Sequence, residues 1–253
     1  MKRIVIMGAS KGIGRDCAEA LASRGVRVGV AARNTGPLKQ LKEKYPEMVE
    51  YEAIDVASSD ARSKLLKLID RLGGMDIYFH VAGIGYENID LDPETEVRIF
   101  ETNTVGFARC VATAWQYFRR NNIKGQIAAV TSVAGTNAIG HIAAYAASKT
   151  ANQKWLLGLQ QLSRLTGAGI AVTDIRPGWI TTDLLDDGAR FPLQMEPSYV
   201  VPQILRAIVR RKKVAVIDWR WNVVVGLWRL IPNSIVRRLD LRRAGTLPKA
   251  GKI

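Results

Sequence analysis

Short runs rich in β-branched residues alternate with longer segments of helical periodicity, and this alternation constrains the fold more than any other feature. The first five predicted strands are 3–7, 26–31, 49–54, 76–80 and 126–131. The predicted helices between them are 12–24, 35–45, 59–72 and 94–120. Because neighbouring parallel strands need a crossover that is usually helical, this order predicts an α/β fold with a doubly wound parallel sheet.

The same pattern continues through the second half of the chain. The further predicted elements are a helix near 142–167, a strand at 170–175, a helix near 198–210 and a strand at 214–217. A sheet of about seven strands with helices on both faces, in three layers, accounts for 253 residues as one large domain. We therefore expect an α/β domain over 1–217 and a C-terminal extension over 218–253.

Positive charge is concentrated at the C-terminal end of the chain. The net charge is +14, and residues 206–252 hold thirteen Lys or Arg against two Asp, which is +11 of that total. A charge this local belongs to an appendage, so it bears on surfaces and partners and not on the fold.

The two cysteines, Cys17 and Cys110, both fall within apolar helical patterns. Neither has neighbours at metal-ligand spacing, so no metal site is predicted. We expect both to be reduced core residues of a cytoplasmic protein.

A glycine-rich turn follows the first strand and opens the first helix. It reads Gly8-Ala-Ser-Lys-Gly-Ile-Gly14, with the spacing G-x-x-x-G-x-G. Glycines there allow the backbone to approach a pyrophosphate, whose charge the amides at a helix N-terminus can hold. The candidate binding residues in this turn are Gly8, Ser10, Lys11, Gly12, Ile13 and Gly14.

Tyr145 and Lys149 are four residues apart in the long predicted helix near 142–167. On a helix they share one face, and a fixed ammonium near a phenol favours the phenolate. A pKa lowered in this way would make Tyr145 a usable acid or base near neutral pH.

Taken in order along the chain, these motifs resemble the short-chain dehydrogenase/reductase family. Tyr145 to Lys149 matches its Tyr-x-x-x-Lys motif, Ser132 lies thirteen residues upstream, and Asn103 stands in an Asn-x-x-Gly. Pro177-Gly178 resembles the turn beside the nicotinamide, and we assign Ile180 and Thr182 to the same site. The resemblance runs from residue 3 to about 217 and implies a Rossmann-type fold that transfers hydride between nicotinamide and a carbonyl or alcohol.

The resemblance also implies roles for the candidate catalytic residues. Tyr145 would exchange the proton while Ser132 holds the substrate oxygen, and Lys149 would also bind the nicotinamide ribose. Asn103 would position a water that links Lys149 to solvent. Homodimers or homotetramers through the helices near 94–120 and 142–167 are usual in the family.

The end of the second strand bears on the choice of cofactor. An acidic residue there would bind the free ribose hydroxyl of NAD, but this chain has Arg33-Asn34. The planar fork of Arg33 suits a 2′-phosphate, and Lys11 is a second cation that could converge on it. We therefore predict NADP(H), with Asp55-Val56 resembling the family's adenine contact.

One segment departs from the family pattern. Where Asn-Asn-Ala-Gly is usual after the fourth strand, the chain has His80-Val81-Ala82-Gly83. Gly83 preserves the close backbone approach to the cofactor, and we assign Ala82 to the same binding site. The missing asparagines remove side-chain hydrogen bonds that brace the sheet and the adenosine ribose. We interpret His80 as a satisfied buried residue. His141, near the site, is interpreted as structural, with contact to substrate as the alternative.

In the C-terminal extension, the pattern of residues 219–231 predicts a short helix in which tryptophan and arginine are interleaved. One side collects the apolar residues Trp221, Val224, Val225, Trp228 and Ile231. Such a helix is typical of a membrane interface, so we expect peripheral contact through 219–243 on the inner face. Packing onto the parent domain or across a dimer is the open alternative. Nucleic-acid binding is disfavoured because the tryptophans sit among aliphatic residues.

The sequence thus predicts an NADPH-dependent reductase of a ketone or aldehyde. Residues 179–197 mix acidic and apolar side chains, as a mobile lid does, and name no substrate. If the extension meets lipid, a lipophilic substrate such as a 3-oxoacyl chain or keto-lipid follows. The alternatives are a dehydrogenase of small alcohols or hydroxy acids, and a membrane-tethered NADPH-binding regulator without turnover.

Overall fold

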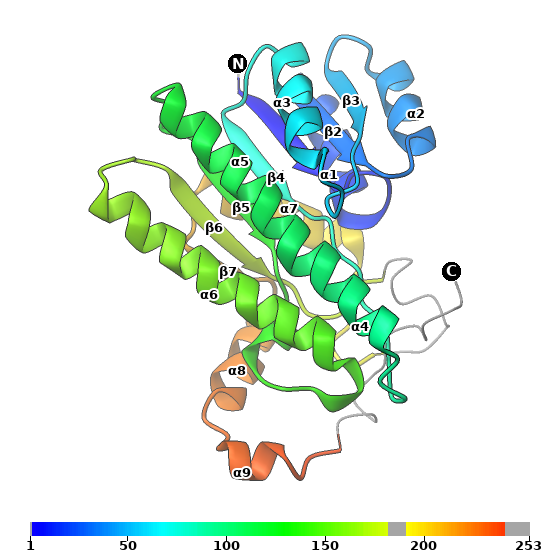
Figure 1. Cartoon of the computed structure of the whole chain (residues 1–253), viewed down its shortest axis with the longest axis vertical. Coiled ribbons are helices and arrows are strands. Elements are labelled where there is room, and N and C mark those ends of the chain that lie inside the picture. Colours follow the sequence, from blue (N-terminus) through cyan, green and yellow to red (C-terminus); the bar gives the residue numbers. More distant parts are fainter. Residues whose placement is uncertain (1, 182–190, 241–253) are drawn as a thin grey trace.

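The computed structural model describes residues 2–181 and 191–240 and contains one parallel sheet in the order β3-β2-β1-β4-β5-β6-β7 (Figure 1). The strands are β1 (Arg3–Met7), β2 (Arg27–Ala32), β3 (Val49–Ala53), β4 (Ile77–His80), β5 (Gln126–Val130), β6 (Ala171–Arg176) and β7 (Val214–Val216). Strand order reverses between β1 and β4, where the carboxyl ends of the strands leave a crevice. The predicted doubly wound, seven-stranded sheet is confirmed.

Helices cover both faces of the sheet. One face carries α1 (Gly12–Ala22), α2 (Gly36–Lys44) and α7 (Pro197–Val209), and the other carries α3 (Ala61–Arg71), α5 (Phe107–Arg120) and α6 (Ala143–Leu165). Because successive strand residues point to opposite faces, Ile6 enters the first core and Val5 the second. Cys17 and Cys110 are buried free thiols, one in each core, as predicted.

The helix predicted over 94–120 is not a single α-helix. It consists of α4 (Pro93–Phe100), a π-helical segment η1 (Glu101–Gly106) and α5. At Gly106 a Cβ would lie only 2.8 Å from the carbonyl oxygen of Val56, so glycine permits this close approach. The π segment contains Asn103, and such segments often occur at functional sites.

The C-terminal extension begins with a tight turn at Asp218, whose φ is +75°. The Asp218 carboxylate accepts the Arg220 backbone N–H at 2.9 Å and pairs with its guanidinium at 2.6 Å, which caps the next helix. Helices α8 (Trp219–Trp228) and α9 (Asn233–Val236) lie outside the three layers (Figure 1). Across residues 2–181 and 191–240, no helix has the length and hydropathy needed to cross a membrane.

Candidate active site

A cavity of about 710 Å³ lies at the carboxyl ends of the central strands. The predicted site residues that line it are Gly8, Ser10, Lys11, Gly12, Ile13, Arg33, Asn34, Asp55, Val56, Ala82, Gly83, Ser132, Tyr145, Lys149, Pro177, Gly178 and Ile180. Gly14 and Asn103 lie behind this lining, whereas Thr182 is outside the described residues. The fold therefore brings segments from both halves of the chain to one site.

The glycine-rich turn forms one wall of the cavity and requires its glycines. Gly8 has φ of +94°, and a Cβ there would lie 2.5 Å from the backbone nitrogen of Ala82. A Cβ on Gly14 would collide with the carbonyl oxygen of Gly8, so α1 could not start so close to β1. The N-terminus of α1, at Gly12, therefore meets the cavity, and this arrangement fits the pyrophosphate of a dinucleotide.

Two exposed cations, Lys11 and Arg33, line the same end of the cavity. The Asn34 side chain accepts the Gly36 N–H at 3.1 Å, and the Asp55 carboxylate accepts the Ala57 N–H at 3.0 Å. Both contacts fix the turns after β2 and β3. With no carboxylate at the end of β2, the donor set fits a cofactor that carries an additional phosphate.

Lys149 is a buried residue of α6 that lines the cavity. Its Nζ donates to the carbonyl oxygen of Val130 at 3.3 Å and lies 5.5 Å from the centroid of the Tyr145 ring. Burial lowers the pKa of Lys149 to about 8, although the charge of Asp174 opposes this shift. The side chain thus loses or gains a proton within the physiological range.

The pKa of Tyr145 moves opposite to the direction predicted from its spacing to Lys149. Burial raises the pKa of the phenol, and a hydrogen bond with the Ser132 side chain only partly offsets this shift. The ammonium lies over the ring, and desolvation of the phenolate dominates. Without a bound ligand, Tyr145 is therefore a neutral proton donor.

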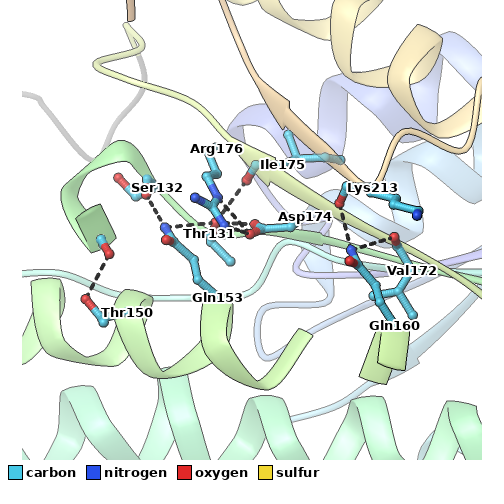
Figure 2. Close-up of polar contacts among 11 residues, drawn as sticks. Thr131, Ser132, Thr150, Gln153, Gln160, Val172, Asp174, Ile175, Arg176 and Lys213 are labelled. Atoms are coloured by element: carbon cyan, nitrogen blue, oxygen red, sulfur yellow. Dashed lines mark hydrogen bonds and ion pairs between the residues drawn. The ribbon is translucent and has the colours of Figure 1, made fainter. Parts of the chain in front are cut away.

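Ser132 follows β5 and caps the short helix η2 (Val133–Thr136). Its Oγ accepts the Ala134 N–H at 3.1 Å, so its own O–H can donate, and the side chain is also hydrogen-bonded with Tyr145. Figure 2 shows a buried polar network behind it that the sequence analysis did not identify. Gln153 donates to the Ser132 carbonyl oxygen, and Thr131 contacts the carboxylate of Asp174.

Asn103 braces the loop after β4. Its Oδ1 accepts the Ile84 N–H at 2.8 Å, and its Nδ2 donates to the Ile84 carbonyl oxygen at 2.7 Å. A Cβ on Gly83 would lie 3.2 Å from Asn103 Oδ1 and 3.3 Å from Lys149 Nζ. Gly83 thus allows these two side chains to approach the cavity wall closely.

The two histidines of the chain are both buried near the site. His80 Nδ1 lies 2.8 Å from the Tyr78 hydroxyl, but its Nε2 has no hydrogen-bond partner among the described residues. His80 is therefore buried as predicted, but it is only half satisfied. Burial lowers its pKa to about 3, so the imidazole is neutral. His141 lines the cavity.

The apolar face of α8 does not point to the outside, as the membrane interpretation of the extension required. Trp221, Val224, Val225 and Trp228 line the cavity. The Trp221 indole donates to the Leu193 carbonyl oxygen at 3.3 Å and packs so closely on Gly178 that a Cβ there would collide with it. The alternative prediction, packing onto the parent domain, holds for this face.

Aromatic side chains extend this apolar wall on the loop that follows β6. Trp179 and Phe191 stack with ring centroids 4.6 Å apart, and Trp179 and Leu193 line the cavity. Of the predicted lid over 179–197, residues 182–190 lie outside the described residues. The side of the cavity opposite the glycine-rich turn is therefore largely apolar, which suits a hydrophobic ligand.

Known proteins share both the sequence pattern and the fold. A family model described as short chain dehydrogenase matches residues 2–190. An uncharacterized oxidoreductase of Myxococcus xanthus is 30% identical over 238 residues, which are 91% of this chain and 93% of the relative. The dehydrogenase/reductase SDR family member 7B of Bos taurus is 30% identical over 268 residues, which are 94% of this chain and 80% of the relative.

A solved structure confirms the fold at greater sequence distance. A short-chain dehydrogenase from Sphingobium yanoikuyae in complex with NADPH superposes with a TM-score of 0.77 at 22% identity, covering 95% of this chain and 97% of that one. The chain therefore belongs to the short-chain dehydrogenase family, oxidoreductases that act on alcohol or carbonyl groups with nicotinamide cofactors.

Proposed function

We propose that the protein is an NADPH-dependent reductase of a bulky, apolar ketone or aldehyde. The observation that carries this proposal is the continuity of the cavity. It joins the glycine-rich turn and Arg33 to Tyr145 and Ser132, and then to the wall of Trp221 and Trp228. A cofactor and an apolar substrate would thus meet at a phenol and a serine hydroxyl.

The reaction follows from the protonation states of these side chains. NADPH, held by the glycine-rich turn and Arg33, would supply the hydride for the carbonyl carbon. Ser132 donates its O–H to the carbonyl oxygen, and the neutral Tyr145 gives its proton to that oxygen as negative charge develops. Lys149, positively charged below about pH 8, stabilises the phenolate left on Tyr145. Lys149 then gives its proton to that phenolate, and Asn103 would hold a water that returns a proton from solvent to Lys149.

The preference for NADPH rests on the two cations at the adenosine end of the cavity. Arg33 provides two parallel N–H donors for a 2′-phosphate, and Lys11 adds a second positive charge. The Sphingobium yanoikuyae neighbour is recorded with NADPH, which agrees with this assignment at the level of the fold.

The test of the mechanism is Tyr145→Phe. We expect NADPH oxidation against a panel of ketones to fall at least about 1000-fold, while NADPH binding, followed by calorimetry, stays within about twofold. Tyr86→Phe is the matched control, because Tyr86 is buried and also lines the cavity. Unchanged turnover in Tyr145→Phe would refute the mechanism.

The same panel separates the alternatives. A dehydrogenase of small alcohols or hydroxy acids would oxidise those substrates with NADP⁺ more efficiently than it reduces bulky ketones. A regulator without turnover would bind NADPH and reduce nothing in the panel.

We propose a second partner for the extension, the inner face of an anionic membrane. The observation that favours it is the outer side of α8, which is apolar like the inner side. Trp219 is 71% exposed, Val223 53% and Leu227 64%, and their spacing of four residues places them on one stripe. Arg229 and Arg237 are exposed nearby, so the surface combines apolar and cationic groups, as interfacial helices do.

Charge distinguishes this partner from a second copy of the chain. A two-fold interface would place this surface against itself and bring arginines together, which is unfavourable. We expect the protein to float with anionic liposomes and not with zwitterionic ones, and Val223→Gln/Leu227→Gln to abolish flotation. Tyr199→Gln/Val209→Gln is the control, since both side chains are exposed on α7. Equal flotation of the two variants would overturn the proposal.

We propose that the protein assembles as a homodimer or homotetramer through α5 and α6. The outer side of α6 exposes Leu157 and Leu165, at 50% and 74%. Association would cover this apolar surface. Light scattering after gel filtration is expected to give a mass of two or four chains, and Leu157→Lys/Leu165→Lys to reduce it.

A further inference from the structure

The last residue of β5 and the two residues that follow it are each held by a side chain, and Figure 2 shows the contacts of Thr131 and Ser132. Lys149 Nζ donates to the carbonyl oxygen of Val130, and the Thr131 hydroxyl donates to Asp174 Oδ1 at 2.5 Å. Gln153 Nε2 donates to the carbonyl oxygen of Ser132 at 2.6 Å. The segment that ends on the serine is therefore fixed from both α6 and β6.

Gln153 is the contact that reaches Ser132 itself. It lies four residues after Lys149 and eight after Tyr145, so all three share one face of α6. Its side chain is buried, and its Nε2 also lies 3.5 Å from the Thr131 hydroxyl. One helix face thus carries the phenol, the ammonium and the amide that holds the serine.

The short helix η2 packs closely against Gln153 and the backbone of α6. A Cβ on Gly135 would lie 2.6 Å from Gln153 Nε2 and 2.8 Å from the carbonyl carbon of Lys149. Thr150 donates to the carbonyl oxygen of Gly135 at 3.0 Å, which fastens η2 to α6 a second time. The turn that carries Ser132 therefore rests directly on the helix that carries Tyr145.

We propose that Gln153 is a positioning residue for the reduction, which sets the place of the Ser132 hydroxyl relative to Tyr145. This inference rests on the proposed function, since it assigns Ser132 to the substrate oxygen. The Ser132 carbonyl oxygen accepts two hydrogen bonds, the shorter from Gln153 and a longer one from the Gly135 N–H at 3.2 Å. Loss of the amide removes the only one of these that comes from α6, so the turn that carries the serine is free to shift away from that helix. A displacement of about 1 Å near a reacting group can reduce turnover strongly.

The chain contains a matched control on the same helix. Like Gln153, Gln160 uses its Nε2 for two hydrogen bonds. It donates to the carbonyl oxygens of Val172 at 3.2 Å and Lys213 at 2.9 Å. Neither of these residues lines the cavity. Gln160→Met therefore removes comparable hydrogen bonds from α6 without touching the serine segment.

We expect Gln153→Met to lower kcat for a ketone about tenfold, with KM and the Kd of NADPH within about twofold. Gln160→Met should retain kcat, and both variants should lose about 2 to 4 °C in Tm. Should Gln153→Met not fold, Gln153→Asn keeps the amide but is too short to reach. Full kcat in the Gln153 variant, or an equal loss of kcat in the Gln153 and Gln160 variants, would overturn the inference.

Amide hydrogen exchange separates this inference from the proposed function. Exchange in residues 131–137 should be faster in Gln153→Met than in the wild type and unchanged in Gln160→Met. If the wild-type protein reduces no ketone, the proposed function is wrong. The exchange data would still test whether Gln153 holds the Ser132 segment. Identical exchange in both variants would show that Gln153 does not hold this segment.

Discussion

The two ends of the cavity are built in different ways. The cofactor end is made of backbone, in which Gly8 and Gly14 let a strand, a turn and a helix start meet closely. The substrate end is made of side chains such as Trp179 and Trp221, which come from segments far apart in the sequence. A local motif can specify the first end, whereas the second depends on tertiary packing. A change of sequence at the substrate end can therefore leave the backbone of the cofactor end intact.

Of the changes that separate the two ends, the largest effect should come from one at the cofactor end. Arg33→Ala removes the planar donor for a 2′-phosphate, so kcat/KM for NADPH should fall about 10- to 100-fold while that for NADH changes less than about twofold. Steady-state kinetics with both cofactors measure this. Arg24→Ala, an exposed site in the turn that follows α1, is the control. An equal loss of kcat/KM for both cofactors would show that Arg33 does not bind the 2′-phosphate.

A smaller effect is expected at the substrate end. Trp228→Ala removes part of the apolar wall, so kcat/KM for bulky ketones should fall about tenfold. Small ketones and NADPH binding should be nearly unaffected. Trp219→Ala on the exposed side of α8 is the matched control. If Trp228→Ala weakened NADPH binding as much as ketone reduction, the two ends would not be separable.

The smallest effect is expected at His80, the last residue of β4, and it depends on pH. The pKa of His80 falls to about 3 in the folded protein, so the unfolded chain takes up a proton first as pH drops below 6.5. This group therefore removes stability at about 1.4 kcal/mol per pH unit from pH 6.5 down towards 3. His80→Asn should remove that slope. Urea unfolding at pH 7, 6 and 5 measures it, and parallel pH dependence of the two proteins would contradict this assignment.

The sheet and the residues that meet at the site were predictable because each depends on local pattern. Alternating periodicity specifies strands and crossovers, and the glycine spacing specifies the turn after β1. The π segment around Asn103 was not predictable, because an interruption of one helical turn leaves the apolar periodicity almost intact.

Features that depend on distant neighbours were also missed or assigned wrongly. The helix α8 is apolar on two sides, so its pattern alone could not show that Trp221 faces the cavity. The pKa of Tyr145 rises because burial outweighs the hydrogen bond with Ser132, and spacing carries no information on burial. The network of Gln153 and Asp174 joins residues that only the fold brings together.

The most direct test of the central claim is the oxidation of NADPH and NADH, measured in parallel, by the wild-type protein. The ketones should form a series graded from small and polar to long-chain. We predict that NADPH is preferred at least about tenfold and that kcat/KM rises with apolar size. No consumption of either cofactor with any ketone, or equal use of both cofactors, would contradict the account.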